Sequence, residues 1–296
     1  MKKKTGTKAI RPLRISMTRT PWLSAFLMIL PALIILLVFY FYPILKLLPR
    51  SVLENGQFDF SRIAELFTDD LYRTTIFRTI GICLAATLIN VLLGYPVAYM
   101  MSRAKKRTAN VFLTIIMLSL WTSLLVRTYS WMVLLQRTGV INRILLALGI
   151  VTEPVQFMYT ETAVLIGMVH LLLPYMILPI YSVLRSIDPN LALAAESMGA
   201  SKTKAFFKVT FPLSIPGMAS GVLLVFIQSL GFYVTPMLLG GSQTLMISGL
   251  IDKQMFTFLD WSFGAALGLV LLFITVIFLL IFNRFFGMDT LRKRMF

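Results

Sequence analysis

The sequence predicts an all-α membrane protein with six membrane-spanning helices. Hydrophobic residues make up 58% of its 296 residues, whereas a soluble globular domain is typically about 45–50% apolar. The apolar residues also gather in unbroken runs of about 20, the length that a helix needs to cross a bilayer. A membrane β-barrel would show short alternating segments instead, so we expect helices throughout.

The six predicted spans cover approximately residues 24–45, 76–101, 111–126, 162–184, 215–239 and 263–282. The first run is too long for the apolar part of a cleaved signal peptide, and no small-residue cleavage site follows it. We therefore expect a spanning helix that bends or loosens near Pro31 and Pro43. An amphipathic piece at 141–148 is expected to lie at the outer interface.

The basic residues predict how the chain is oriented. The net charge is +16, but Lys and Arg lie at the ends of the apolar runs and not on a folded face, so nucleic acid is not an expected partner. The N-terminal tail (1–20), the loops 102–110 and 185–211, and the C-terminal end hold 19 of the 28 Lys and Arg residues. The positive-inside rule then predicts that both termini are cytoplasmic, with the N-terminal tail against anionic lipid. The transmembrane domain is expected to cover 21–286, followed by a second basic tail, 287–296.

Several function classes are disfavoured by what the sequence lacks. A single cysteine, Cys83, and a single histidine, His170, cannot form a metal site or a nucleophile–base pair, so the chain is not expected to be an enzyme. No phosphate-binding Gly-x-x-x-x-Gly-Lys-Ser/Thr segment is present, so an ATP-driven process needs another subunit. A secondary transporter driven by an ion gradient remains the alternative, although it typically needs intramembrane carboxylates and the six runs contain none.

The cytoplasmic loop 185–213 has the signals of two short helices joined by a sharp turn. Asp188 is a good N-cap, and Pro189 suits the first helical position. Gly199 suits the position after the helix, where the backbone needs a positive φ. Ser201 can cap a second helix, which we expect to end at Pro212.

The first of these helices carries small side chains at Ala194 and Ala195, with Gly199 beyond them. Such a face allows another protein surface to approach closely. The plain alternative is an amphipathic helix that rests on lipid headgroups.

The segments Ala194–Ala200 and Phe211–Gly217 resemble the EAA loop of permease subunits in binding-protein-dependent ABC importers. The match consists of the two alanines, a Gly-Ala pair four residues later, and a Pro-x-x-x-Pro-Gly entry to the next span. In that family the loop forms a coupling helix that docks in a groove of the cytoplasmic ATPase. The residues that the resemblance assigns to coupling are Leu193, Ala194, Ala195, Glu196, Gly199, Ala200, Phe206 and Pro212. Leu193 stands where the family usually has a glutamate, and Glu196, three residues later, is a possible substitute for it.

The resemblance covers nearly the whole chain. It includes Leu30–Leu33 and Tyr42-Pro43 in the first span, Arg127–Trp131 followed by Gly139–Asn142, and Gly231–Pro236 with Leu239–Gly241. Within the family, these segments are most similar to the spermidine/putrescine-type permeases.

The resemblance implies the type I ABC importer permease architecture in a bacterial inner membrane. It also implies a second homologous permease (a heterodimer), two copies of a cytoplasmic ATPase, and a periplasmic or lipid-anchored substrate-binding protein. The expected substrate is a polyamine or a related small organic solute. No cofactor is expected in this chain, since the ATPase subunits would bind ATP and Mg.

Polar and aromatic residues near the spans are candidates for the substrate pathway. Helix–helix hydrogen bonding is the favoured role for Asn90 and His170. A pathway role is favoured for Gln228 and Tyr233, which lie next to Gly231 and Pro236, because these two residues can break the fifth span. For Tyr129 and Trp131, an aromatic belt at the membrane surface is the alternative to a gate or a cation–π contact with the substrate. The predicted pathway residues are Tyr129, Trp131, Gln228, Tyr233 and Thr235. Because the spans contain no carboxylate, either aromatics and the partner permease meet the cation, or the substrate is not a polyamine.

Overall fold

A computed structural model describes residues 21–54, 57–58 and 60–286. The regular elements among the described residues are helices, apart from one short hairpin in which β1 (Leu53–Glu54) pairs antiparallel with β2 (Gln57–Phe58). The predicted all-α class is therefore confirmed. The chain divides into two compact units, Met1–Pro49 and Arg50–Phe296. Both basic tails, 1–20 and 287–296, lie outside the described residues.

The first unit contains one long apolar helix. It consists of α1 (Pro21–Leu36), a π-helical turn η1 (Leu37–Phe41) and α2 (Tyr42–Leu47), followed by the 3₁₀ turn η2 (Leu48–Ser51). The wide turn lies directly before Pro43, which has no N–H to donate to a normal helical turn. The predicted loosening near Pro43 is thus confirmed, whereas Pro31 lies inside regular α-helix.

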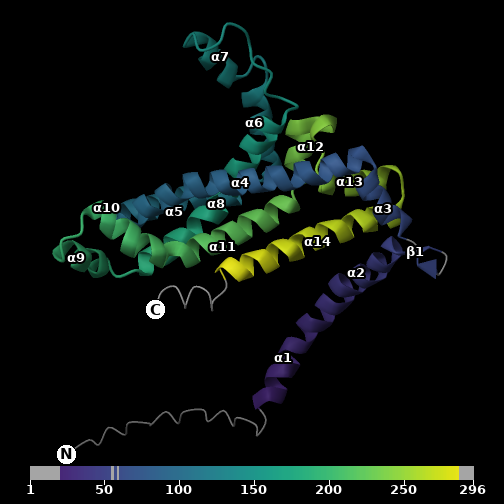
Figure 1. Ribbon diagram of the computed structural model, residues 1–296, viewed down its shortest axis with the longest axis horizontal. Helices are drawn as coiled ribbons and strands as arrows, with labels where there is room; N and C mark the ends of the chain where they lie inside the picture. Colours follow the sequence, from purple (N-terminus) through teal and green to yellow (C-terminus); the bar gives the residue numbers. More distant parts are fainter. Residues whose placement is uncertain (1–20, 55–56, 59, 287–296) are drawn as a thin grey trace, which may run out of the picture. The chain divides into compact units, whose positions relative to one another are not determined.

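The second unit holds the remaining helices (Figure 1). Its first half contains α3 (Ser61–Thr68), α4 (Asp70–Arg103), α5 (Lys106–Trp121), α6 (Leu124–Leu135), α7 (Val140–Ala147) and α8 (Glu161–Ser186). Its second half contains α9 (Pro189–Ser197), α10 (Lys202–Ala205), the π turn η3 (Phe206–Thr210), α11 (Phe211–Leu230), α12 (Val234–Gly240), the 3₁₀ turn η4 (Gly241–Thr244), α13 (Ile247–Asp252), the π turn η5 (Lys253–Thr257) and α14 (Trp261–Phe286).

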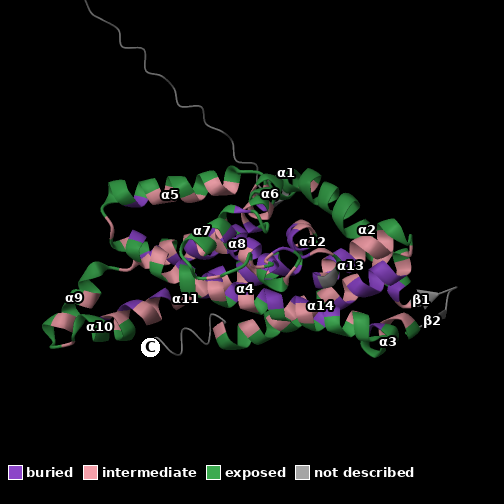
Figure 2. Ribbon diagram, turned by 90° about the horizontal axis from the view of Figure 1, so that it is seen from above, coloured by how far each residue is buried: buried purple, intermediate pink, exposed green. Residues whose placement is uncertain are grey.

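Helix α8 is the centre of the second unit and packs along both α4 and α11. Figure 2 shows buried residues concentrated on these helices, whereas α5 is largely exposed. The backbones of α8 and α11 approach closely at Gly217 and Gly221, a small-xxx-small spacing that is common between membrane helices. A Cβ atom added at Gly221 would lie 2.7 Å from Met176 Sδ and 3.2 Å from the Met176 carbonyl oxygen.

In the described part of the chain, five helices are long and apolar enough to cross a membrane, and a sixth span is formed if the bent pair Lys106–Trp121 and Leu124–Ala147 counts as one. The pair is bent by 95°. The predicted third span, 111–126, was therefore wrong at its end, because Thr122 and Ser123 both adopt extended backbone and stop α5. The amphipathic piece predicted at 141–148 forms α7.

The fifth span was also predicted with wrong limits, at 215–239. Helix α11 ends at Leu230, and the chain restarts as α12 after a break at Gly231, which confirms the expected break. At the other end, the helix expected to stop at Pro212 continues through η3 into α11. The π turn again precedes a proline by two residues, as it does in the first unit.

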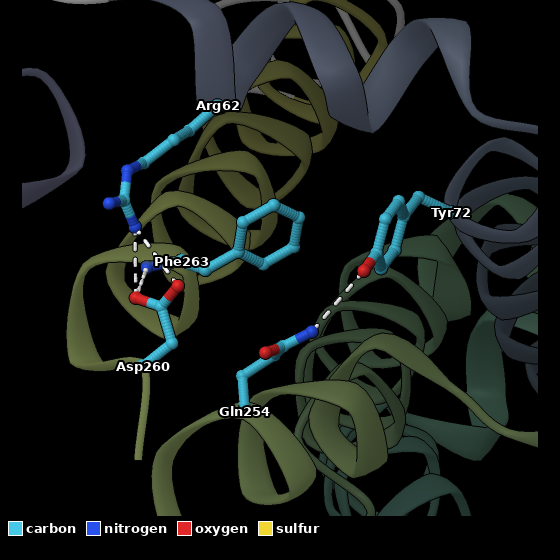
Figure 3. Close-up of polar contacts among 5 residues, drawn as sticks. All are labelled: Arg62, Tyr72, Gln254, Asp260 and Phe263. Carbon is cyan, nitrogen blue, oxygen red and sulfur yellow. Dashed lines mark hydrogen bonds and ion pairs between the residues drawn. The ribbon is translucent and has the colours of Figure 1, made fainter. Parts of the chain in front are cut away.

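The end of the unit opposite α9 is held by a polar network between segments far apart in the sequence (Figure 3). Arg62 Nη1 on α3 donates to both carboxylate oxygens of Asp260, at 2.9 and 3.1 Å. Asp260 Oδ1 also accepts the Phe263 backbone N–H, and so caps α14. Gln254 Nε2 donates to the Tyr72 hydroxyl beside them. Beneath these contacts lies a second apolar cluster formed by α3, α4, α13 and α14.

Candidate functional site

The loop after α8 has the capped helix–turn–helix that the sequence predicts. Asp188 Oδ1 accepts the Asn190 backbone N–H at 2.9 Å, and Ser201 Oγ accepts that of Lys204 at 3.3 Å. Gly199 has a φ of +91° and terminates α9. The two caps and the turn at Gly199 together fix the direction of α9 relative to the long helix that begins at Lys202.

One face of α9 is open. Leu191, Ala194 and Met198 follow helical spacing and are exposed, with Met198 85% exposed, and Ala195 lies between them. The small alanines of the predicted docking face are thus flanked by two large apolar side chains, which the sequence interpretation had not singled out. An exposed apolar face next to polar segments is typical of a protein-binding surface.

The opposite face of α9 borders a cavity of about 220 Å³ at the end of α4. Glu196 lies on this inner side together with Arg103 of α4 and Lys202 of α10. Glu196 therefore does not belong to the open face, although it was a candidate for an ATPase contact. Leu193 also borders the cavity but is 56% exposed.

Aromatic rings join this loop to the helices of the core. Phe206 lies 5.0 Å from Tyr99 and 6.2 Å from Tyr95 between ring centroids, and Phe211 lies 5.6 Å from Tyr95. The Tyr95 hydroxyl is 2.8 Å from Ser214 Oγ, which links α4 to α11. The rings of η3, α4 and α11 therefore form one packed group next to α9, and packed rings resist independent movement. This arrangement gives the predicted coupling residue Phe206 a structural role, and Pro212 stands at the entry of α11 beside it.

The predicted pathway residues do not form one cluster. Thr235 on α12 is fully buried, and its hydroxyl lies 3.1 Å from that of Thr128 on α6. Gly167 on α8 allows α12 to approach this closely. Tyr129 and Gln228 are exposed.

Trp131 contacts His170, which sequence reasoning assigned to packing. Its indole Nε1 donates to His170 Nδ1 at 3.1 Å, so the proton of a neutral His170 is assigned to Nε2. The two residues border an almost entirely apolar groove of about 360 Å³ between α4, α6 and α8. Asn90 is fully buried, but its side-chain amide donates to the Ala86 carbonyl oxygen of its own helix, so the expected helix–helix hydrogen bond is not seen among the described residues.

Tyr233 brings a carboxylate to the break between α11 and α12. Its hydroxyl donates to Asp252 Oδ2 at 2.8 Å. This hydrogen bond is the main cause of a raised pKa of the Tyr233 hydroxyl. The sequence analysis did not connect Asp252 with Tyr233, because a contact across 19 residues has no local sequence signal. Among the described residues, no group of three or more His, Cys, Asp or Glu could hold a metal ion.

Comparisons with known proteins agree with this geometry. Residues 90–294 match the family model of the binding-protein-dependent transport system inner membrane component. The chain is 34% identical over 257 residues to the spermidine/putrescine transport system permease protein PotB of Escherichia coli (strain K12), covering 84% of this chain and 93% of that protein. It is 37% identical over 210 residues to PotB of Haemophilus influenzae, covering 70% and 73%.

The fold is also similar to that of a solved structure, a bacterial alginate ABC transporter in complex with a periplasmic protein bound to an alginate pentasaccharide. The TM-score is 0.76 at 18% identity, over 90% of this chain and 95% of that chain. The chain therefore belongs to the family of binding-protein-dependent transport system inner membrane components, and it is a multi-pass permease subunit of an ABC importer.

Proposed function

We propose that this permease forms half of a translocation pathway and is driven by a cytoplasmic ATPase that docks on the open face of α9. The observation that carries the proposal is the combination of an exposed apolar face (Leu191, Ala194, Met198) with rigid aromatic packing behind it. The first feature suits a partner surface, and the second suits transmission of its movement. Closure of the ATPase on ATP would then tilt α9 and shift α4 and α11 as rigid bodies.

The proposed assembly contains two permeases, two copies of the ATPase and a substrate-binding protein outside the membrane. ATP and Mg would be bound by the ATPase copies, and this chain would need no cofactor of its own. Both termini would be cytoplasmic. The basic residues of the α9–α11 region (Lys202, Lys204 and Lys208) support this side for the coupling loop.

We propose a polyamine or a related small organic solute as the substrate. The names of the PotB relatives support this class. Asp252, bonded to Tyr233 beside the break after α11, supplies a carboxylate next to an aromatic ring. Such a pair suits an ammonium group, which a carboxylate attracts and an aromatic face can also stabilise.

Uptake of radiolabelled spermidine tests both parts of the proposal. The permease would be co-expressed with its second permease, its ATPase and its binding protein. We expect Ala194→Asp to reduce uptake at least tenfold and to lower the amount of ATPase that co-purifies, because it places a charge in the apolar contact. Ser197→Asp adds the same charge to an exposed position outside this face and should retain most uptake.

Normal uptake by Ala194→Asp would exclude the proposed docking face. If the wild-type complex hydrolyses ATP but imports no spermidine or putrescine, the substrate class is wrong while the coupling proposal stands.

A further inference from the structure

Arg127 is a partly buried charged residue of the second unit. It lies in the first turn of α6, one turn before Trp131, whose ring bonds His170 in α8. His170 is the tenth residue of α8, so it lies about 14 Å along that helix at 1.5 Å per residue. Because Arg127 is four residues, or about 6 Å, from Trp131 along α6, it lies level with the interior of α8.

Two nitrogen atoms of the Arg127 guanidinium lack a partner in the part of the chain that the structure describes. Its Nε and Nη1 atoms are buried and have no hydrogen-bond partner among the described residues. A guanidinium stays protonated in proteins and has only donors, so each N–H requires an acceptor. A buried charge without a partner is strongly unfavourable, and intramembrane charged residues almost always pair with another group. An acceptor is therefore required from outside the described residues.

A second copy of this permease does not provide that acceptor. Between their first and last residues, the long helices α4, α8, α11 and α14 contain no Asp or Glu. Of the acids at helix ends, Asp70, Glu161 and Asp260 already pair with Arg73, Arg78 and Arg62, and Asp252 accepts a hydrogen bond from Tyr233. A homodimer would also add a second Arg127 to the same layer, and like charges repel.

Two other acceptors fit less well. Lipid phosphates lie at the membrane surface, whereas Arg127 lies level with the interior of α8. The substrate proposed above is a cation, which an unpaired arginine would repel. The exposed neighbours of Arg127 on α6 are apolar or aromatic (Leu125, Val126, Tyr129 and Val133), a composition that suits the buried centre of a protein interface.

We infer that Arg127 forms an ion pair with an aspartate or glutamate in a membrane span of a second, non-identical permease. This inference rests on the proposed function, because it takes the cargo to be a cation and the complex to contain two permeases. Part of the Arg127 side chain is accessible, and its flexible stem can turn the remaining donors towards an incoming carboxylate. The pair neutralises the pathway wall for a cationic cargo, and it explains physically why two different permeases are needed.

The test measures how much second permease co-purifies with the tagged chain in mild detergent. We expect Arg127→Gln to lower the recovered second permease at least fivefold and Arg127→Glu to reduce it to background. Arg127→Lys should retain about half or more, because it keeps the charge. Arg137→Gln, at an exposed arginine beyond α6, is the matched control and should equal the wild type. Replacing the paired acid of the second permease by Lys should restore recovery with Arg127→Glu.

Full recovery of the second permease with Arg127→Glu would overturn the inference. It would also be overturned if Arg127→Gln assembled normally but lost binding of an anionic solute, since Arg127 would then hold the cargo. Maleimide labelling of the buried Cys83 identifies a purified variant that is misfolded. For such a variant, the deciding result is whether the acid-to-Lys change in the second permease restores its recovery. If the pair is found but spermidine is not imported, only the proposed substrate fails.

Discussion

At the scale of single residues, Asp260 shows how one carboxylate can stabilise two elements (Figure 3). It pairs with Arg62 of α3 and caps the first turn of α14. The ion pair is partly exposed, at 23% for Arg62 and 41% for Asp260, so it contributes about 0.5–1 kcal/mol at most. The cap contributes about 1 kcal/mol.

We therefore predict that Asp260→Ala lowers stability by about 1–2 kcal/mol, whereas Asp260→Asn, which can still cap α14, lowers it by roughly half as much. The measurement is thermal unfolding followed by maleimide labelling of Cys83, the single cysteine of the chain, which is fully buried. Asp70→Asn removes an exposed pair with Arg73 and serves as the control. Equal effects of Ala and Asn would show that the cap contributes little.

At the scale of elements, α8 and α11 pack through their backbones at Gly221. We predict that Gly221→Ala lowers stability by about 1–3 kcal/mol, because the new methyl group would meet Met176 backbone atoms, which cannot turn away. Gly81→Ala is a matched control on α4: it has nothing within 4 Å of the added Cβ, so it should be neutral or stabilise by up to about 1 kcal/mol. The Cys83 labelling assay measures both, and equal behaviour of the two variants would contradict the packing argument.

The elements also show what the sequence could and could not predict. The turn between α9 and α10 follows from local signals, since Asp188, Gly199 and Ser201 each act within a few residues. The end of α5 was misjudged, because an apolar run continues across Thr122 and Ser123 although the backbone turns there.

Contacts between distant segments had no sequence signal at all. Examples are Arg62 with Asp260, 198 residues apart, and Thr128 with Thr235, 107 residues apart. The local structure of the coupling loop could therefore be predicted, whereas the roles of its residues in coupling stay predictions. The burial of Thr235 and the contact of Asp252 with Tyr233 depend on packing and could not be predicted from the sequence.

At the scale of the whole molecule, the proposals depend on which side of the membrane α9 faces. The distribution of Lys and Arg favours the cytoplasm for α9 and the opposite side for α3. In a Cys83→Ala background, single cysteines can be introduced at exposed positions of each element: Thr68→Cys on α3 and Ser197→Cys on α9. Ser220→Cys on α11 tests a position that should lie in the apolar layer.

We predict that a membrane-impermeant maleimide labels Thr68→Cys in intact spheroplasts and labels Ser197→Cys only after lysis. Ser220→Cys should react in neither case, because the reagent does not enter the bilayer and a thiol there does not ionise readily. The reverse pattern for the first two positions would place α9 outside the cell, where no ATPase could reach it. In that case the fold and the family would stand, but the docking face would have to serve the binding protein instead.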